Sequence, residues 1–247
     1  GRVVTQLLIK PLLALCLILC AGSALLFAKK SAASYGCFAL AWILNLTVFA
    51  LNCVHAQAPA FGNMFHVMVF LPLALPVFYL YGRRVGAADT LPTFAWVAAL
   101  VFLGTLFMDT QADWRQMPAL QSPWFVPHVF TYLVAYALLA VAAALSVRRM
   151  KQADMFAGFG FAFLTLGLVS GALWADEVWG YFWSWDIKEV WALVTWVIYL
   201  AYFHLKEKTR LSATGRVVLA LGFLALLITF FAVNLLPKIS SLHSYAS

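Results

Sequence analysis

The sequence has very few charged residues, which make up 10% of its 247 positions, with 16 lysines and arginines against 9 acids. Hydrophobic residues account for 65% of the chain, and its mean hydropathy is +0.92. This composition excludes a soluble globular domain. Apolar runs of 18 or more residues indicate membrane-spanning helices. The sequence therefore predicts an all-α integral membrane protein.

Several sequence motifs that indicate a particular enzymatic chemistry are also missing. There is no glycine-rich phosphate loop, no zinc-ligand spacing and no nucleophile elbow, which argues against an ATP-driven role within this chain. There is no Cys-x-x-Cys pair either. The four cysteines fall in apolar runs, where buried packing is the favoured role. Any thiol chemistry therefore has to use the thiols of a partner.

We expect one polytopic membrane domain over residues 1–247, a bundle of about eight spans. The spans lie at about 6–28, 35–54, 64–82, 92–108, 126–147, 154–173, 188–206 and 215–236. The first is interpreted as a helix and not as a signal peptide. The chain starts at Gly1 without an initiator methionine, which suggests a processed, tagged or excised chain, or part of a longer fusion.

The basic residues give the orientation. Of the 16 lysines and arginines, 11 fall in alternate connections, which the positive-inside rule assigns to the cytoplasmic side. Both termini and the connection between the sixth and seventh spans then lie outside. Because the net charge of +7 is explained by topology, it does not indicate a nucleic-acid partner.

The connection between the sixth and seventh spans is an amphipathic loop rich in tryptophan. Residues 174–196 hold six of the ten tryptophans. Interfacial belts spread aromatic residues over many helix ends, whereas this sequence concentrates them in one place. That concentration suits a flat aromatic ligand, and iron porphyrin is the leading candidate. The candidate ligand-binding residues are Trp174, Trp179, Trp183 and Trp185.

Three histidines are candidate ligands. His128 lies at the start of the fifth span and His243 follows the eighth, so both are expected on the outside, one on either side of the tryptophan-rich stretch in sequence. His204 lies near the inner end of the seventh span, where an ionisable residue is a functional candidate by default, although an anchoring role fits its position equally well. For His55 and His66, a packed or interfacial histidine is the favoured interpretation.

Asp186 and Glu189 form a capping-box pattern at the start of the seventh span. We favour this structural role over proton transfer for both acids. Three outer cations, Arg115, Lys188 and Lys238, are candidates for pairing with the carboxylates of a bound ligand.

The segment Trp-Gly-Tyr-Phe-Trp-Ser-Trp-Asp-Ile-Lys-Glu-Val-Trp, residues 179–191, resembles the tryptophan-rich WWD signature of haem-handling proteins in cytochrome c maturation. It is most similar to the CcsA (ResC) branch, because the Lys-Glu pair after the aspartate differs from the CcmC and CcmF signatures. The segments around His128 and His243 resemble the two external histidines of that branch, and that around His204 its transmembrane histidine. Ile187 stands where the family usually has proline, a change expected to cost only a little rigidity at the helix start.

The resemblance implies a haem transporter and cytochrome c synthase of the haem-lyase type in the bacterial inner membrane, with its tryptophan loop and both termini in the periplasm. It implies haem b (iron protoporphyrin IX) as cofactor, with His128, His243 and His204 as ligands of the iron. His128, His243 and Asp186 are the catalytic candidates. The implied partners are membrane lipid, a CcsB/ResB-type subunit, to which relatives are sometimes fused, and an apocytochrome c carrying Cys-x-x-Cys-His.

Two other functions fit parts of the pattern. A haem-delivery component would use the same residues but hand haem to a chaperone without attaching it. A transporter or structural bundle would use the tryptophans only as an interfacial anchor.

Overall fold

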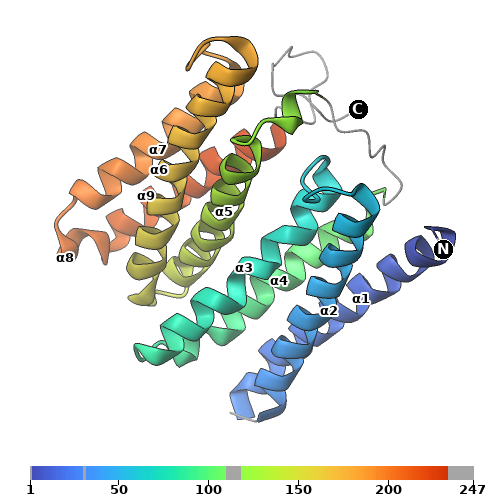
Figure 1. Ribbon diagram of the computed structural model, residues 1–247. Helices are drawn as coiled ribbons and strands as arrows, with labels where there is room; N and C mark the ends of the chain where they lie inside the picture. The colour runs from blue at the N-terminus through green and yellow to red at the C-terminus, as the bar shows by residue number, and fades with distance from the viewer. Residues whose placement is uncertain (1, 30–31, 110–117, 233–247) are drawn as a thin grey trace. The chain divides into compact units, whose positions relative to one another are not determined.

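The computed structural model describes residues 2–29, 32–109 and 118–232, and every regular element in these ranges is a helix (Figure 1). Seven of these helices are long and apolar enough to cross a membrane. An eighth, α7, is 18 residues long, roughly 27 Å at 1.5 Å per residue. Its first turn carries charged residues and its last residue is a histidine. The predicted all-α membrane bundle is confirmed.

The chain divides into two compact units, residues 1–116 and 117–247. In the first unit α1 packs against α2 and α4, and α3 packs against the same two helices. The elements of this unit are α1 (Arg2–Leu26), η1 (Phe27–Lys29), α2 (Ala32–Ala56), α3 (Met64–Arg84), η2 (Ala88–Thr90) and α4 (Leu91–Leu106).

Some polar side chains of the first unit join its helices. The Asn45 amide nitrogen donates a hydrogen bond to the Val69 carbonyl at 3.0 Å, which connects α2 with α3. His66 is buried in the first turns of α3, and its backbone N–H donates to the Asn63 side chain that caps the helix. His55 lies in the last turn of α2.

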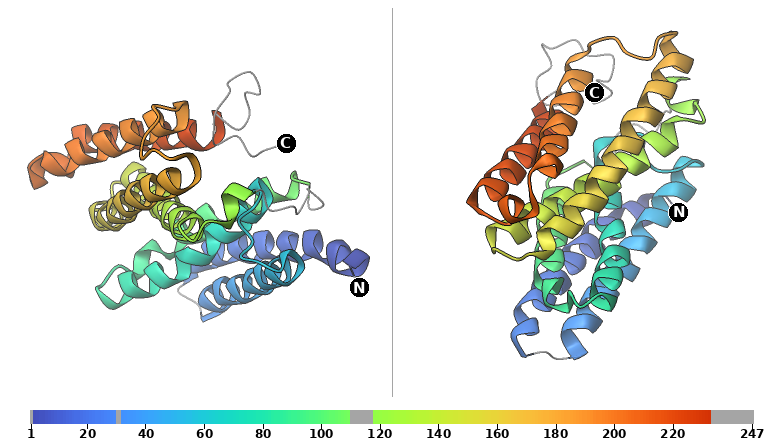
Figure 2. Two further views of the ribbon diagram at one scale, coloured as in Figure 1. Left: turned by 45° about the horizontal axis from the view of Figure 1, so that its top comes forward. Right: turned by 90° about the vertical axis from the view of Figure 1, so that its left-hand side faces the viewer.

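The second unit consists of two pairs of helices in two layers (Figure 2). One layer is the antiparallel pair α5 and α6, and the other is α7 with α9. Its elements are η3 (Pro118–Gln121), α5 (Phe125–Val147), α6 (Gln152–Trp179), α7 (Ile187–His204), α8 (Glu207–Arg210), α9 (Ala213–Leu227) and the π-helical continuation η4 (Ile228–Ala232).

Helix α6 is longer than the predicted sixth span, which ended at residue 173. It continues through Trp179 and ends at Gly180, whose φ of 79° places it in the left-handed conformation that glycine adopts at helix C-termini. The Gly180 N–H donates to the Asp176 carbonyl at 2.8 Å. Trp174 and Trp179 are therefore helical, and the non-helical part of the tryptophan-rich stretch is residues 180–186.

Candidate functional site

His128 lies in the first turns of α5 with its half-buried imidazole directed at α6. Its Nδ1 lies 3.0 Å from the Gly167 carbonyl oxygen. Because a carbonyl can only accept, Nδ1 must carry the hydrogen, and the lone pair of the neutral ring is then on Nε2. Metal-binding histidines commonly have this arrangement, in which a backbone acceptor selects the ring nitrogen that faces the metal.

An aromatic cluster surrounds this imidazole. Trp174 stacks on His128, with ring centroids 5.4 Å apart and planes inclined by 22°. Trp179 meets Trp174 edge-on at 5.0 Å, and Tyr132 meets His128 edge-on at 5.0 Å. Phe125 closes the cluster against Trp174 at 5.6 Å. We call these five residues the aromatic cluster.

Two long-range hydrogen bonds hold the cluster in place. Trp174 is 2% exposed, and its indole N–H donates to the Ala119 carbonyl at 2.9 Å. The Ser122 hydroxyl donates to the Glu177 carboxylate at 2.7 Å. Both bonds connect the segment before α5 with the last turns of α6, so they fix the direction in which α5 begins.

Glycines in α6 allow the rings of α5 to approach closely. A Cβ added at Gly171 would lie 2.6 Å from both Cε1 and Nδ1 of His128, and one at Gly167 would lie 2.6 Å from the Tyr132 ring. About two turns closer to the start of α6, a Cβ at Gly160 would lie 2.6 Å from the Leu139 side chain. Each of these glycines thus makes room for one side chain of α5. The three contacts follow a single antiparallel alignment of the two helices.

Residues 180–186 present aromatic surface outward. Trp185 is 70% exposed and has a φ of 60°, and Phe182 is 55% exposed. Trp183 packs edge-on against Trp185 at 6.0 Å. The indole N–H of Trp183 is buried and has no hydrogen-bond partner within the described parts of the chain. A buried donor beside exposed rings is a feature that a ligand with acceptor groups can satisfy.

The predicted capping box at the start of α7 is confirmed. The Asp186 carboxylate accepts from the Lys188 N–H at 2.9 Å. The Glu189 carboxylate, 8% exposed, accepts from the Asp186 N–H at 3.2 Å and from the Ser184 N–H at 2.8 Å. Glu189 therefore also ties the tryptophan-rich connection to the helix that follows it.

The capping role of Asp186 can be tested by substitution. Asp186→Asn should keep the cap, because asparagine caps about as well as aspartate, whereas Asp186→Ala should lower stability by about 1 kcal/mol. Thermal unfolding measures both effects. An Asp186→Asn protein that is destabilised as much as Asp186→Ala would contradict the capping role.

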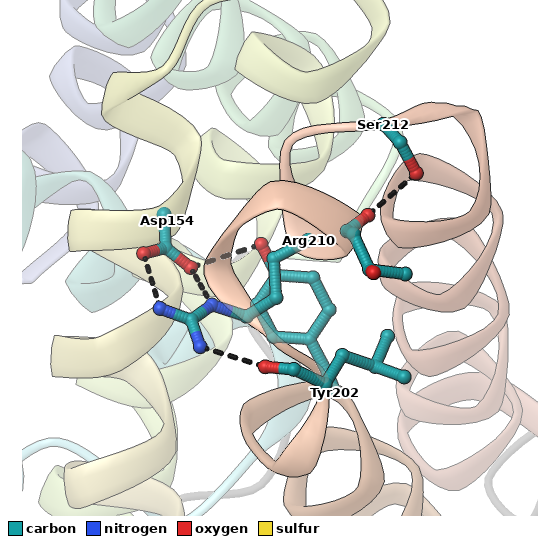
Figure 3. A network of polar contacts seen from close by, with 6 residues as sticks. Asp154, Tyr202, Arg210 and Ser212 are labelled. Carbon is teal, nitrogen blue, oxygen red and sulfur yellow. Dashed lines mark hydrogen bonds and ion pairs between the residues drawn. The ribbon is translucent and has the colours of Figure 1, made fainter.

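His204 lies at the last position of α7 and is exposed. Its Nδ1 lies 2.7 Å from the Leu200 carbonyl oxygen, so it has the same tautomer as His128, with the lone pair on Nε2. The Asp154 carboxylate joins α6, α7 and α8, as Figure 3 shows. Arg210 donates to it through Nε at 2.8 Å and through a second guanidinium nitrogen at 3.2 Å, and the Tyr202 hydroxyl donates to it at 3.1 Å. The hydrogen bond to Asp154 raises the pKa of Arg210 above its usual range.

The structure brings three of the predicted residues, His128, Trp174 and Trp179, into one cluster, and packs Trp183 against Trp185. His243 lies outside the described residues, as do Arg115 and Lys238. The glycines that accommodate the α5 rings were not predicted. Their signal was available, because Gly167 and Gly171 form the small-x-x-x-small spacing typical of closely packed membrane helices.

Comparisons with known proteins identify the family. A sequence model of the family described as "Cytochrome C assembly protein" matches residues 6–241. The CcsA protein of Cuscuta exaltata is 34% identical over 53% of this chain and 57% of its own length. That of Chlamydomonas reinhardtii is 37% identical over 52% of this chain and 42% of its own length. The CcsA protein of Amborella trichopoda is 28% identical over 75% of this chain and 77% of its own length.

The chain spans about half the length of the first two of these relatives. Among solved structures, a protein named "Cytochrome c Heme Lyase CcmF" superposes with a TM-score of 0.69 at 19% identity, over 92% of this chain and 46% of that chain. At this identity the match concerns the fold. The chain belongs to the cytochrome c assembly protein family, and the relatives that it resembles are CcsA proteins of cytochrome c biogenesis.

Proposed function

We propose that this protein carries haem b to the external face of a bacterial inner membrane and attaches it covalently to apocytochrome c. The observation that carries the proposal is the setting of His128: its Nδ1–H is held by the Gly167 carbonyl and its ring stacks on Trp174. Such an imidazole is oriented to offer Nε2 to an iron whose porphyrin lies against aromatic surface. Family membership supplies the substrate class.

In this proposal His128 and His243 ligate the iron from opposite faces outside, and His204 holds haem in transit. The exposed rings of Trp185 and Phe182 supply apolar surface for the macrocycle, and the buried Trp183 N–H is suited to a propionate oxygen. The two units act together as one membrane domain over residues 1–247. A CcsB/ResB-type subunit, separate or fused, completes the functional complex.

The attachment step is chemically balanced without a further reactant. Each cysteine thiol of the apocytochrome's Cys-x-x-Cys-His adds across one haem vinyl group. An S–H bond and the vinyl π bond break, while a C–S bond and a C–H bond form. No leaving group and no oxidant are needed, so the task of the protein is to hold both partners in position and to exclude water.

Reconstitution tests this function. The protein and its CcsB/ResB-type partner would be placed in nanodiscs with haem, a reductant and apocytochrome c, and covalent haem would be measured by mass spectrometry. We expect one haem per Cys-x-x-Cys-His, and none from an apocytochrome with both cysteines changed to serine. Haem bound and released to the apocytochrome without thioether formation would favour haem delivery. If the purified protein is colourless, it holds no haem, and only the function of a transporter or structural bundle would remain.

The proposed orientation can be measured with single cysteines. In a variant whose four native cysteines are replaced by serine, a membrane-impermeant maleimide added to intact spheroplasts should label Asp176→Cys. It should label Arg148→Cys only after the membrane is opened. The reason is the division of the basic residues between the two sides. Labelling of both positions from outside would contradict the span model.

His204 is expected to affect haem loading and not attachment itself. His204→Ala should lower the haem content of the purified protein several-fold, because the ligand on the inner side is lost. Added imidazole should partly restore it by filling the vacant axial position. The absorption spectrum measures both. Full haem content and full cytochrome c output in His204→Ala would reduce His204 to an interfacial anchor.

A further inference from the structure

A second site lies at the end of the second unit that holds the α6 N-terminus, whereas the aromatic cluster is at the α6 C-terminal end. A small pocket of about 70 Å³ opens where the α5–α6 turn, the end of α7, α8 and the start of α9 meet. Most of its polar lining is cationic. The polar lining residues are Ser146, Arg149, Lys151, Asp154, Arg210 and Arg216, together with Tyr202.

The single acidic residue in this lining already has hydrogen-bond donors within the protein. Asp154 accepts two hydrogen bonds from Arg210 and one from Tyr202, as Figure 3 shows. Within the described ranges, Arg149, Lys151 and Arg216 form no ion pair with an acidic side chain. Three positive charges therefore surround a small space with no protein anion to balance them, which favours an anionic ligand.

Arg149 has a backbone conformation that favours glycine over other residues. Its φ is 58°, in the left-handed region. The flanking hydrogen bonds, from the Met150 N–H to the Leu145 carbonyl at 3.0 Å and from the Arg149 N–H to the Ser146 carbonyl at 2.9 Å, complete a tight helix C-terminal turn. Glycine adopts this conformation at no steric cost, whereas a side chain makes it unfavourable. The arginine thus costs stability where it stands, and Arg149 is one of the residues that line the pocket.

We propose that this pocket binds the phosphate of an anionic membrane phospholipid. Arginine is the side chain best suited to phosphate, which it can contact with two parallel hydrogen bonds. Basic pockets between membrane helices are a known setting for anionic headgroups. The lining also includes the apolar residues Met150, Ala153, Leu211 and Leu219, which suit the glycerol backbone and upper acyl chains of a lipid.

The size of the pocket excludes haem itself as the occupant. About 70 Å³ is less than half of the roughly 150 Å³ of a cavity that holds one benzene molecule, so a porphyrin ring does not fit. His204 is not part of the lining. The proposal therefore does not depend on the proposed function.

The test counts lipid molecules that stay bound. The full protein, purified in detergent with phosphatidylglycerol and phosphatidylcholine in equal amounts, would be examined by native mass spectrometry. Wild type should retain one phosphatidylglycerol in preference to phosphatidylcholine. Arg149→Gly and Arg216→Gln should each retain about tenfold less, because one charged hydrogen-bond partner of the phosphate is removed.

Two controls make the result specific. Arg148 is exposed, lies next to Arg149 in sequence and does not line the pocket. The Arg148→Gln variant removes the same charge and should retain lipid as wild type does. Arg149→Gly should not lower the melting temperature, since glycine suits its φ. Loss of lipid in that variant therefore reports lost binding and not unfolding.

Three outcomes would overturn the proposal. Arg149→Gly could retain lipid at the wild-type level, and if it also lost haem, the pocket would be assigned to a propionate. Arg148→Gln could lose as much lipid as Arg149→Gly, which would indicate surface charge alone. Excess inorganic phosphate could displace all retained lipid, which would assign the pocket to a soluble phosphate.

Discussion

His128→Ala is expected to abolish covalent haem attachment and to remove the six-coordinate, low-spin spectrum of the external haem. The reason is that His128 presents Nε2 from a ring held by the Gly167 carbonyl and stacked on Trp174. With two neutral imidazoles the iron has no open position, and with one removed the spectrum should become high-spin. Absorption spectroscopy and covalent haem in the product measure the two effects.

His55→Ala is the matched control, because a packed or interfacial role is favoured for this histidine in the last turn of α2, and its spectrum and product should be unchanged. External imidazole should restore the low-spin spectrum of His128→Ala without restoring full attachment, since a diffusible ligand is not positioned by α6. The double variant His128→Ala, His243→Ala should hold no external haem. A bis-histidine spectrum that survives in the double variant would move the site, with His55 and His66 the next candidates.

Gly171→Ala is the second change expected to have a large effect, although it touches no ligand atom. The new Cβ would lie 2.6 Å from Cε1 and Nδ1 of His128, closer than a packed carbon can be, so the imidazole has to leave its hydrogen bond with Gly167. We expect haem affinity to fall about tenfold or more, because losing this orienting bond weakens metal ligation by about 10- to 100-fold. Haem titration measures the affinity.

Gly158→Ala on the same helix is the matched control. A Cβ at Gly158 has only the Phe203 ring within reach, at an ordinary contact distance of 4.0 Å. Both changes raise intrinsic helix propensity by about 1 kcal/mol, so they differ mainly in the contact with His128. Equal haem affinity in the two variants would show that the imidazole does not need its place against α6, and the site geometry proposed above would fail.

The parts of the site predicted from sequence are those that depend on local chain geometry. The capping box of Asp186 and Glu189 joins residues three apart, and its hydrogen bonds follow from how a helix begins. The helix positions also followed from long apolar runs. The end of α6 was placed too early, because Asp176 and Glu177 break the apolar run although they do not break a helix.

The contacts that build the aromatic cluster could not be predicted in this way. Trp174 and Ala119 are 55 residues apart in sequence, as are Ser122 and Glu177. Which residues meet depends on the relative register of α5 and α6, which the hydropathy pattern of neither helix specifies. The glycine spacing in α6 indicates a close approach but does not identify the residue that fills it.

The three glycine contacts between α5 and α6 also limit how this unit can move. Sliding one helix along the other by a single turn, about 5.4 Å, would take His128, Tyr132 and Leu139 out of their places simultaneously. Intermediate positions are sterically closed, since each side chain would meet a Cβ or the α6 backbone. The α5–α6 pair is therefore a rigid frame, and His128 keeps a constant place along α6.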